Sequence, residues 1–132
     1  MWNPNPMSEN CQLSLLHLLH MLIGIDGDRD TAELVAFKAI VERERISADL
    51  VEAFENSLRH KKEREIYQTG IDLISCCTLE EKLKTFALLY RMSEVDGRVH
   101  VKEIKLLLYS IKSAGLEFDD VVRAAKSGQT YI

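Results

Sequence analysis

The 132-residue chain contains little that would interrupt a helix. Its only prolines, Pro4 and Pro6, lie within the first seven residues, so no later segment has to break at a missing backbone N–H. Aromatic residues make up 7% of the chain, and the β-branched residues do not form the alternating runs that are typical of strands. We therefore predict an all-α protein, a single-domain helical bundle of about six to seven helices.

The sequence also lacks a membrane-spanning stretch, a secretory signal and a basic surface. Its most apolar segment, residues 13–25, contains two histidines and Gly24 and is shorter than the roughly 20 residues that cross a bilayer. The formal net charge is −4, and the one basic cluster, within residues 59–64, is interleaved with glutamate as on a solvated helix face. These features predict a cytoplasmic protein without direct membrane insertion and without a nucleic-acid partner.

Cysteine is scarce as well. Cys11, Cys76 and Cys77 cannot all pair within one chain, and adjacent cysteines close only a strained ring. Neither a C-x-x-C pair nor a Cys-His spacing typical of a structural zinc site occurs. We therefore expect free thiols in a reducing cytosol.

What the chain does contain is a repeat. When Asp26-Gly27 is laid on Asp96-Gly97, Glu33 falls on Glu103 and apolar positions on both sides coincide. The match predicts two pseudo-symmetric halves, about 13–54 and about 78–126, joined by a connecting helix at about 55–77. A flexible leader over residues 1–7 would precede the domain over 8–132. Chance agreement is the alternative, because apolar periodicity aligns any two amphipathic helices.

The two Asp-Gly corners hold the candidate functional residues. Four carboxylates lie close together in sequence at the first corner, and a hard cation with oxygen ligands would relieve their mutual repulsion. The candidate metal ligands are Asp26, Asp28, Asp30 and Glu33 at the first corner and Asp96, His100 and Glu103 at the second.

Other interpretations of these residues stay open. Asp30 and Glu33 have the spacing of a capping box, which would satisfy the first backbone amides of the following helix without any ion. The first corner also begins like an EF-hand, but Thr31 stands where that loop needs glycine and Phe37 where it needs glutamate. His17 and His20, one helical turn apart, could hold a metal ion, although core histidines are the commoner explanation.

The segment from Glu94 to Ile104, EVDGRVHVKEI, lies between a Leu-rich helix and an amphipathic one. It resembles the TerB-like family, which includes tellurite-resistance proteins and the N-terminal domain of DnaJ-type membrane-anchored co-chaperones. The resemblance covers most of the chain and departs from the family pattern at His100, where an acidic or small polar residue is usual. It implies an all-helical domain with two pseudo-symmetric halves, acidic loops proposed to bind divalent ions, and a link to metal or oxyanion stress.

We accordingly expect a TerB-like interaction or sensing module with a protein partner and, at its acidic corners, a divalent cation such as calcium, magnesium, manganese or zinc. The alternative is a metal-free protein–protein interaction scaffold whose loops only cap helices. No nucleophile elbow, oxyanion loop or glycine-rich phosphate cradle occurs, so we assign no catalytic residue and predict that the protein is not an enzyme.

Overall fold

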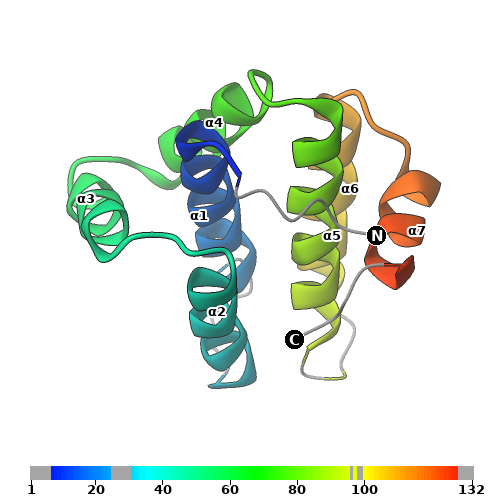
Figure 1. Ribbon diagram of the computed structural model, residues 1–132, viewed down its shortest axis with the longest axis horizontal. Coiled ribbons are helices and arrows are strands. Elements are labelled where there is room, and N and C mark those ends of the chain that lie inside the picture. The colour runs from blue at the N-terminus through cyan, green and yellow to red at the C-terminus, as the bar shows by residue number, and fades with distance from the viewer. Residues whose placement is uncertain (1–6, 25–30, 96, 98–99, 128–132) are drawn as a thin grey trace.

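The computed structural model describes residues 7–24, 31–95, 97 and 100–127. These residues form seven helices and no strand, which confirms the all-α prediction (Figure 1). The helices are α1 (Glu9–Gly24), α2 (Thr31–Arg43), α3 (Ala48–Leu58), α4 (Glu63–Ile74), α5 (Leu79–Glu94), α6 (Val101–Ser113) and α7 (Phe118–Ser127). Within these described ranges, no helix is long and apolar enough to cross a membrane.

Helix α1 forms the centre of the bundle. It is apolar nearly all round, and it contacts α2, α3, α4, α5 and α6. Leu15, Leu16 and Leu19 are fully buried. Figure 1 shows α1 and α5 side by side in the middle, with α3 and α7 at opposite ends of the molecule. Burial of such large apolar side chains is the main source of stability in a domain of this size.

The most extensive helix contact joins α1 to α4. Gly70 permits it, because a Cβ atom at this position would stand 2.9 Å from Leu18 Cδ2 and 3.2 Å from His17 Cβ. The Ser14 hydroxyl donates a hydrogen bond to the Gly70 carbonyl oxygen at 2.8 Å. A glycine on α4 and a small polar residue on α1 therefore let the two backbones approach closely.

Polar side chains cap the starts of two helices. Ser47 Oγ accepts a hydrogen bond from the Leu50 amide at 3.1 Å, before α3. Before α5, Thr78 Oγ1 accepts from the Glu81 amide at 3.1 Å and Glu81 Oε1 accepts from the Thr78 amide at 3.0 Å. This reciprocal pair is the capping box expected from the T-x-x-E sequence.

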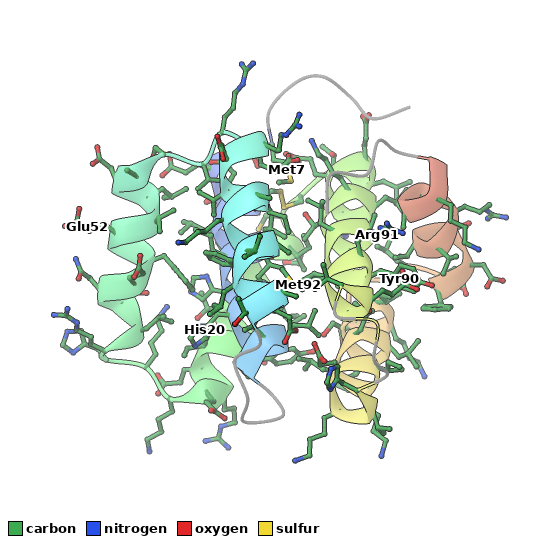
Figure 2. The ribbon with its side chains drawn as sticks, turned by 90° about the horizontal axis from the view of Figure 1, so that it is seen from below. Met7, His20, Glu52, Tyr90, Arg91 and Met92 are labelled. Carbon is green, nitrogen blue, oxygen red and sulfur yellow. A yellow bond between two sulfur atoms is a disulfide. The ribbon has the colours of Figure 1, made fainter. Side chains whose placement is uncertain are left out.

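The first seven residues include one that belongs to the interior. Met7 is buried, and the Thr85 hydroxyl donates a hydrogen bond to its sulfur at 3.6 Å. In Figure 2, Met7 and Met92 lie inside the bundle, whereas Glu52 points outward. The rest of the leader that we predict over residues 1–7 lies outside the described residues.

The local structure repeats in the register of the sequence match, which lays Asp26 on Asp96. In that register α5 and α6 begin and end where α1 and α2 do, and α7 begins where α3 does. A hydrogen bond repeats too: Gln12 Nε2 donates to the Glu44 carbonyl oxygen at 3.3 Å, and Lys82 Nζ donates to the Ala114 carbonyl oxygen at 3.4 Å. The packing differs, because α7 lies closely on α5 whereas α4 instead of α3 covers most of α1.

The helix pair α1–α2 also contacts the helix pair α5–α6. Helix α2 contacts α5 as well as α1, and α6 contacts α1 as well as α5. An ion pair strengthens one of these crossings, since Lys84 Nζ on α5 lies 2.7 Å from Glu44 Oε1 at the end of α2. The helix pairs α1–α2 and α5–α6 therefore share one apolar core.

Helices α2 and α6 end in the same type of turn. The Ile46 amide donates to the Val41 carbonyl oxygen at 3.0 Å, and the Leu116 amide donates to the Ile111 carbonyl oxygen at 3.1 Å. This bond belongs to the Schellman motif, in which one residue takes a left-handed conformation. That residue is Gly115 (φ 79°) after α6 but Arg45 (φ 55°) after α2.

His17 is a core residue. Its side chain is 3% exposed, Nδ1 donates to the Leu13 carbonyl oxygen at 2.7 Å, and the ring meets Phe54 edge-on at a centroid distance of 4.8 Å. His20 contacts the same Phe54 ring. Burial holds the pKa of His17 below its usual value, and Lys61 and His20 lower it further.

The two left-handed positions predict opposite effects of substitution. Arg45→Gly should raise the free energy of unfolding by up to about 1 kcal/mol, because glycine adopts positive φ without steric cost. Gly115→Ala should lower it by about 1 kcal/mol for the converse reason. Urea unfolding midpoints measure both changes. Arg45→Ala is the control, and a stabilisation equal to that of Arg45→Gly would contradict the backbone explanation.

His17 predicts a pH-dependent stability. The unfolded chain binds a proton at His17 with a pKa near 6.5, whereas the folded chain binds it at a lower pH. The contribution of the neutral ring is thus fully present above about pH 6.5 and is lost as the pH falls below that value. In thermal melts between about pH 7 and pH 5.5, His17→Leu should flatten this decline, whereas His60→Gln, at an exposed site, should leave it unchanged.

Candidate functional site

Three of the seven predicted metal ligands lie in the described part of the chain. Glu33 occupies the third position of α2, and Glu103 occupies the third position of α6, its counterpart in the repeat. His100 is the residue before α6. The other four, Asp26, Asp28, Asp30 and Asp96, lie outside the described residues.

Both glutamates are buried, with exposed fractions of 2% for Glu33 and 1% for Glu103. A glutamate that caps a helix start does not have to be buried. Glu65 and Glu81 take the same third position in α4 and α5, and their carboxylates accept hydrogen bonds from the Lys62 and Thr78 amides. Glu65 is nevertheless exposed and Glu81 is half-buried. The two glutamates that follow Asp-Gly corners are thus more deeply buried than the two that cap α4 and α5.

Because these carboxyl groups are buried, the groups around them determine how much free energy their ionised form costs. An ionised carboxylate taken out of water costs several kcal/mol unless hydrogen bonds or positive charge compensate it. The amides and the partial positive charge of a helix N-terminus favour a carboxylate at the position of Glu33 and Glu103. Each corner therefore places a buried carboxyl group at a helix N-terminus.

His100 lies beside one of these carboxylates. Its Nδ1 atom is 3.6 Å from Glu103 Oε2, and its ring makes no capping hydrogen bond to α6. The preceding Gly97 has a φ of 75°, a left-handed conformation that glycine adopts without strain and that fits a turn between two helices.

The starts of α2 and α6, which hold Glu33 and Glu103, lie at one end of the bundle. Helices α1 and α5 start at the same end, because the Glu81 carboxylate on α5 accepts a hydrogen bond from the Ser8 amide just before α1. Figure 1 shows α2 and α6 beginning at the opposite end, where α1 and α5 stop. Among the described residues, however, Glu33, His100 and Glu103 do not form a cluster of three donor atoms within 4.8 Å of one another.

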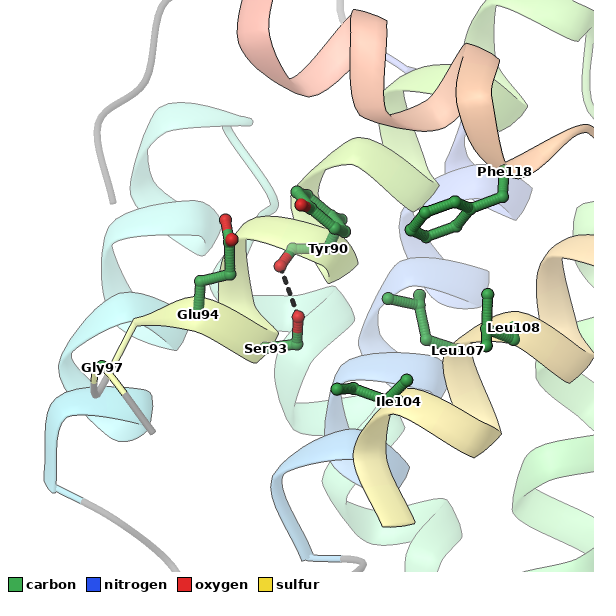
Figure 3. A pocket seen from close by; sticks show the side chains of 8 residues that line it. All are labelled: Tyr90, Ser93, Glu94, Gly97, Ile104, Leu107, Leu108 and Phe118. Atoms are coloured by element: carbon green, nitrogen blue, oxygen red, sulfur yellow. Dashed lines mark hydrogen bonds between the residues drawn. The ribbon is translucent and has the colours of Figure 1, made fainter. Parts of the chain in front are cut away.

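An apolar groove lies near the second corner (Figure 3). It encloses about 390 Å³ between α5, α6 and α7. Its lining residues are Tyr90, Ser93, Glu94, Gly97, Ile104, Leu107, Leu108 and Phe118. The rings of Tyr90 and Phe118 meet edge-on with centroids 5.9 Å apart. Burial raises the pKa of Tyr90, and the nearby Glu94 carboxylate raises it further, so the phenol stays neutral.

A second groove of about 380 Å³ lies between α1, α2 and α3. Four of its lining residues correspond, in the register of the repeat, to lining residues of the first groove: His20, Ile23, Leu34 and Phe37. The periodicity of α6 predicts Ile104 and Leu108 on the same core face as Leu107 and Ile111. They are instead 38% and 43% exposed, because they border the open groove.

The cysteines contradict the expectation of three free thiols. Cys11 and Cys77 form a disulfide, and Cys76 is free and exposed. The first turn of α1 lies against the segment between α4 and α5, so the two Cα atoms are 6.1 Å apart, within the range that a disulfide spans. No spacing rule could show this, since 66 residues separate the two cysteines.

Comparisons with known proteins address the fold. No family description and no curated protein matches the sequence. The structure is similar to the crystal structure of a protein of unknown function from Porphyromonas gingivalis W83, with a TM-score of 0.69 and 17% sequence identity. The likeness covers 96% of this chain and 96% of that chain. It therefore shows that the helical arrangement as a whole, and not one helical hairpin, occurs in another protein.

Proposed function

We propose that this protein is a TerB-like interaction or sensing module that binds a divalent cation at its acidic Asp-Gly corners. The observation that carries the proposal is the burial of Glu33 and Glu103, in contrast to the exposed Glu65 and the half-buried Glu81 at the same helix position. The resemblance of residues 94–104 to the TerB-like family supports the same function.

Chemistry favours a cation at these corners. Carboxylate oxygens are the ligands that calcium, magnesium and manganese prefer, and an imidazole such as that of His100 suits manganese and zinc. Glu33 follows three aspartates in the sequence, and Glu103 follows one. The carboxylate oxygens of the two buried glutamates would be ligands of such a cation. Binding of the cation would change the conformation of the segments that precede α2 and α6. The surface available to a protein partner would change with it.

The groove between α5, α6 and α7 favours a second function, a metal-free interaction scaffold. Ile104, Leu108 and Phe118 are large apolar side chains that remain partly exposed along it. Apolar surface of this kind, rimmed by polar groups, is typical of interaction sites. In this alternative the corners only cap helices, and the partner is a protein. Neither proposal assigns a reaction to the chain, and both place it in the cytoplasm.

A cation that binds the folded chain alone must raise its melting temperature. At a concentration 100 times its dissociation constant, the gain is about 2.7 kcal/mol. We expect calcium, manganese or zinc to raise the melting temperature of the wild type by several degrees. The double variants Glu33→Gln/Glu103→Gln and Asp26→Asn/Asp28→Asn should lose most of this rise.

Glu65→Gln is the matched control, because it changes an exposed glutamate at the same helix position. Glutamine can still cap a helix start, so the paired variant tests the charge more than the hydrogen bond. If every ion shifts both double variants as much as the wild type, the corners bind no cation and the scaffold function stands.

A further inference from the structure

A second group of potential metal ligands lies at the other end of the bundle, where α1 and α5 begin. Cys11 is in the first turn of α1, Cys77 precedes α5, and Glu81 is in the first turn of α5. The two sulfur atoms and a Glu81 carboxylate oxygen all lie within 4.8 Å of one another. Cys11 is buried, whereas Cys77 and Glu81 are partly accessible.

We propose that reduction of the Cys11–Cys77 disulfide converts this group into a zinc-class metal site, in which two thiolates and the Glu81 carboxylate bind the ion. This end of the bundle would then be cross-linked either by a covalent bond or by a metal ion. The site shares no residue with the acidic corners, so it is independent of the function proposed above.

The backbone spacing suits both states. A Cα separation of 6.1 Å lies within the disulfide range. In a tetrahedral zinc site with Zn–S bonds of about 2.3 Å, the two sulfurs stand roughly 3.8 Å apart. Rotation of the two cysteine side chains therefore moves the sulfurs from a bonded to a metal-bridged position, and neither helix has to shift.

Glu81 is already oriented for such a site. Its Oε1 atom accepts a hydrogen bond from the Thr78 amide at 3.0 Å, and its Oε2 atom accepts one from the Ser8 amide at 2.8 Å. A carboxylate offers about four lone-pair positions, so each oxygen keeps one for a metal ion. The same two hydrogen bonds lower the pKa of Glu81, which keeps the carboxylate charged.

The electrostatics of the reduced state also favour an ion. Two thiolates and a carboxylate would repel one another, and the N-termini of α1 and α5 provide only partial positive charge. A borderline-soft divalent ion such as zinc accepts sulfur and oxygen ligands together. Cys76 is not among the donor atoms that lie within 4.8 Å of one another, so the fourth position falls to water.

The reducing step needs a dithiol. A thiolate of the dithiol attacks Cys77, the more accessible sulfur, which breaks the protein disulfide and releases Cys11 as a thiolate. The second thiol of the dithiol then attacks the mixed disulfide, so that the dithiol leaves oxidised and Cys77 is released. Two electrons pass to the protein, and binding of the divalent ion to the two cysteines displaces their protons.

Cobalt(II) makes the site visible, because thiolate ligands give it a charge-transfer band and tetrahedral coordination gives it strong visible bands. The full chain is reduced with dithiothreitol, desalted under nitrogen and titrated with cobalt. We expect one equivalent to bind with a thiolate band that zinc abolishes, and no such band in the oxidised chain. Cys76→Ser and Asp26→Asn/Asp28→Asn should keep the band.

Cys11→Ser and Cys77→Ser should lose the thiolate band, and Glu81→Gln should weaken cobalt binding by at least on the order of tenfold, the cost of losing even an outer-shell partner. Absence of the band from the reduced wild type, or its loss in Cys76→Ser, would overturn the proposal. So would an undiminished band in Cys11→Ser or Cys77→Ser.

Alkylation of the wild type avoids any dependence on variants that fail to fold. With zinc present, iodoacetamide should label Cys76 as before and Cys77 several-fold more slowly, as measured by peptide mass. Equal labelling of Cys77 with and without zinc would show that the reduced pair binds no ion.

Discussion

A helix with almost no polar face has to be covered on every side, and this requirement shapes the whole protein. Five other helices contact α1, and its closest neighbour, α4, reaches it because Gly70 has no side chain. The polar groups on α1 are drawn into the same packing. Ser14 bonds to the α4 backbone, and the His17 ring is buried against Phe54. The chemistry at the two ends of the bundle depends on this central helix, because it fixes where its neighbours begin and stop.

Since α1 and α5 start side by side, and α2 and α6 start together at the opposite end, two helix N-termini lie at each end of the bundle. The N-termini of α1 and α5 meet around the Glu81 carboxylate, and those of α2 and α6 hold Glu33 and Glu103 at the opposite end. Helix N-termini attract negative groups through their amides and dipoles. Acidic side chains therefore lie at both ends of the bundle. Glu33 and Glu103 lie at the starts of α2 and α6, and Glu81 lies beside the sulfurs of Cys11 and Cys77 at the other end.

Features set by local chemistry were predictable from the sequence. The Ser47 and Thr78 caps, the turn at Gly97 between two helices, and the common register of the helix boundaries in the two halves all follow from neighbouring residues or from a repeated pattern. Features set by distant contacts were not. Periodicity places Ile104 on an apolar face but does not show whether another helix covers it.

The burial of Glu33 and Glu103 is set by distant contacts and could not be predicted from the sequence. Their spacing from the helix start predicts a cap, which serves equally well in water, as Glu65 shows. Only the packing of α2 and α6 against the bundle removes them from solvent. The Cys11–Cys77 bond is likewise invisible in the sequence, because it depends on the α4–α5 segment folding back to the start of α1.

That bond makes a closed covalent ring of the chain from α1 to the start of α5, with its two closing residues 66 positions apart. A tensile load applied to the chain ends would pass through the disulfide and bypass the ring. While the disulfide is intact, the maximum extended length of the chain is shorter by on the order of 200 Å. The extensibility of the whole chain is thus set by the oxidation state of two sulfur atoms.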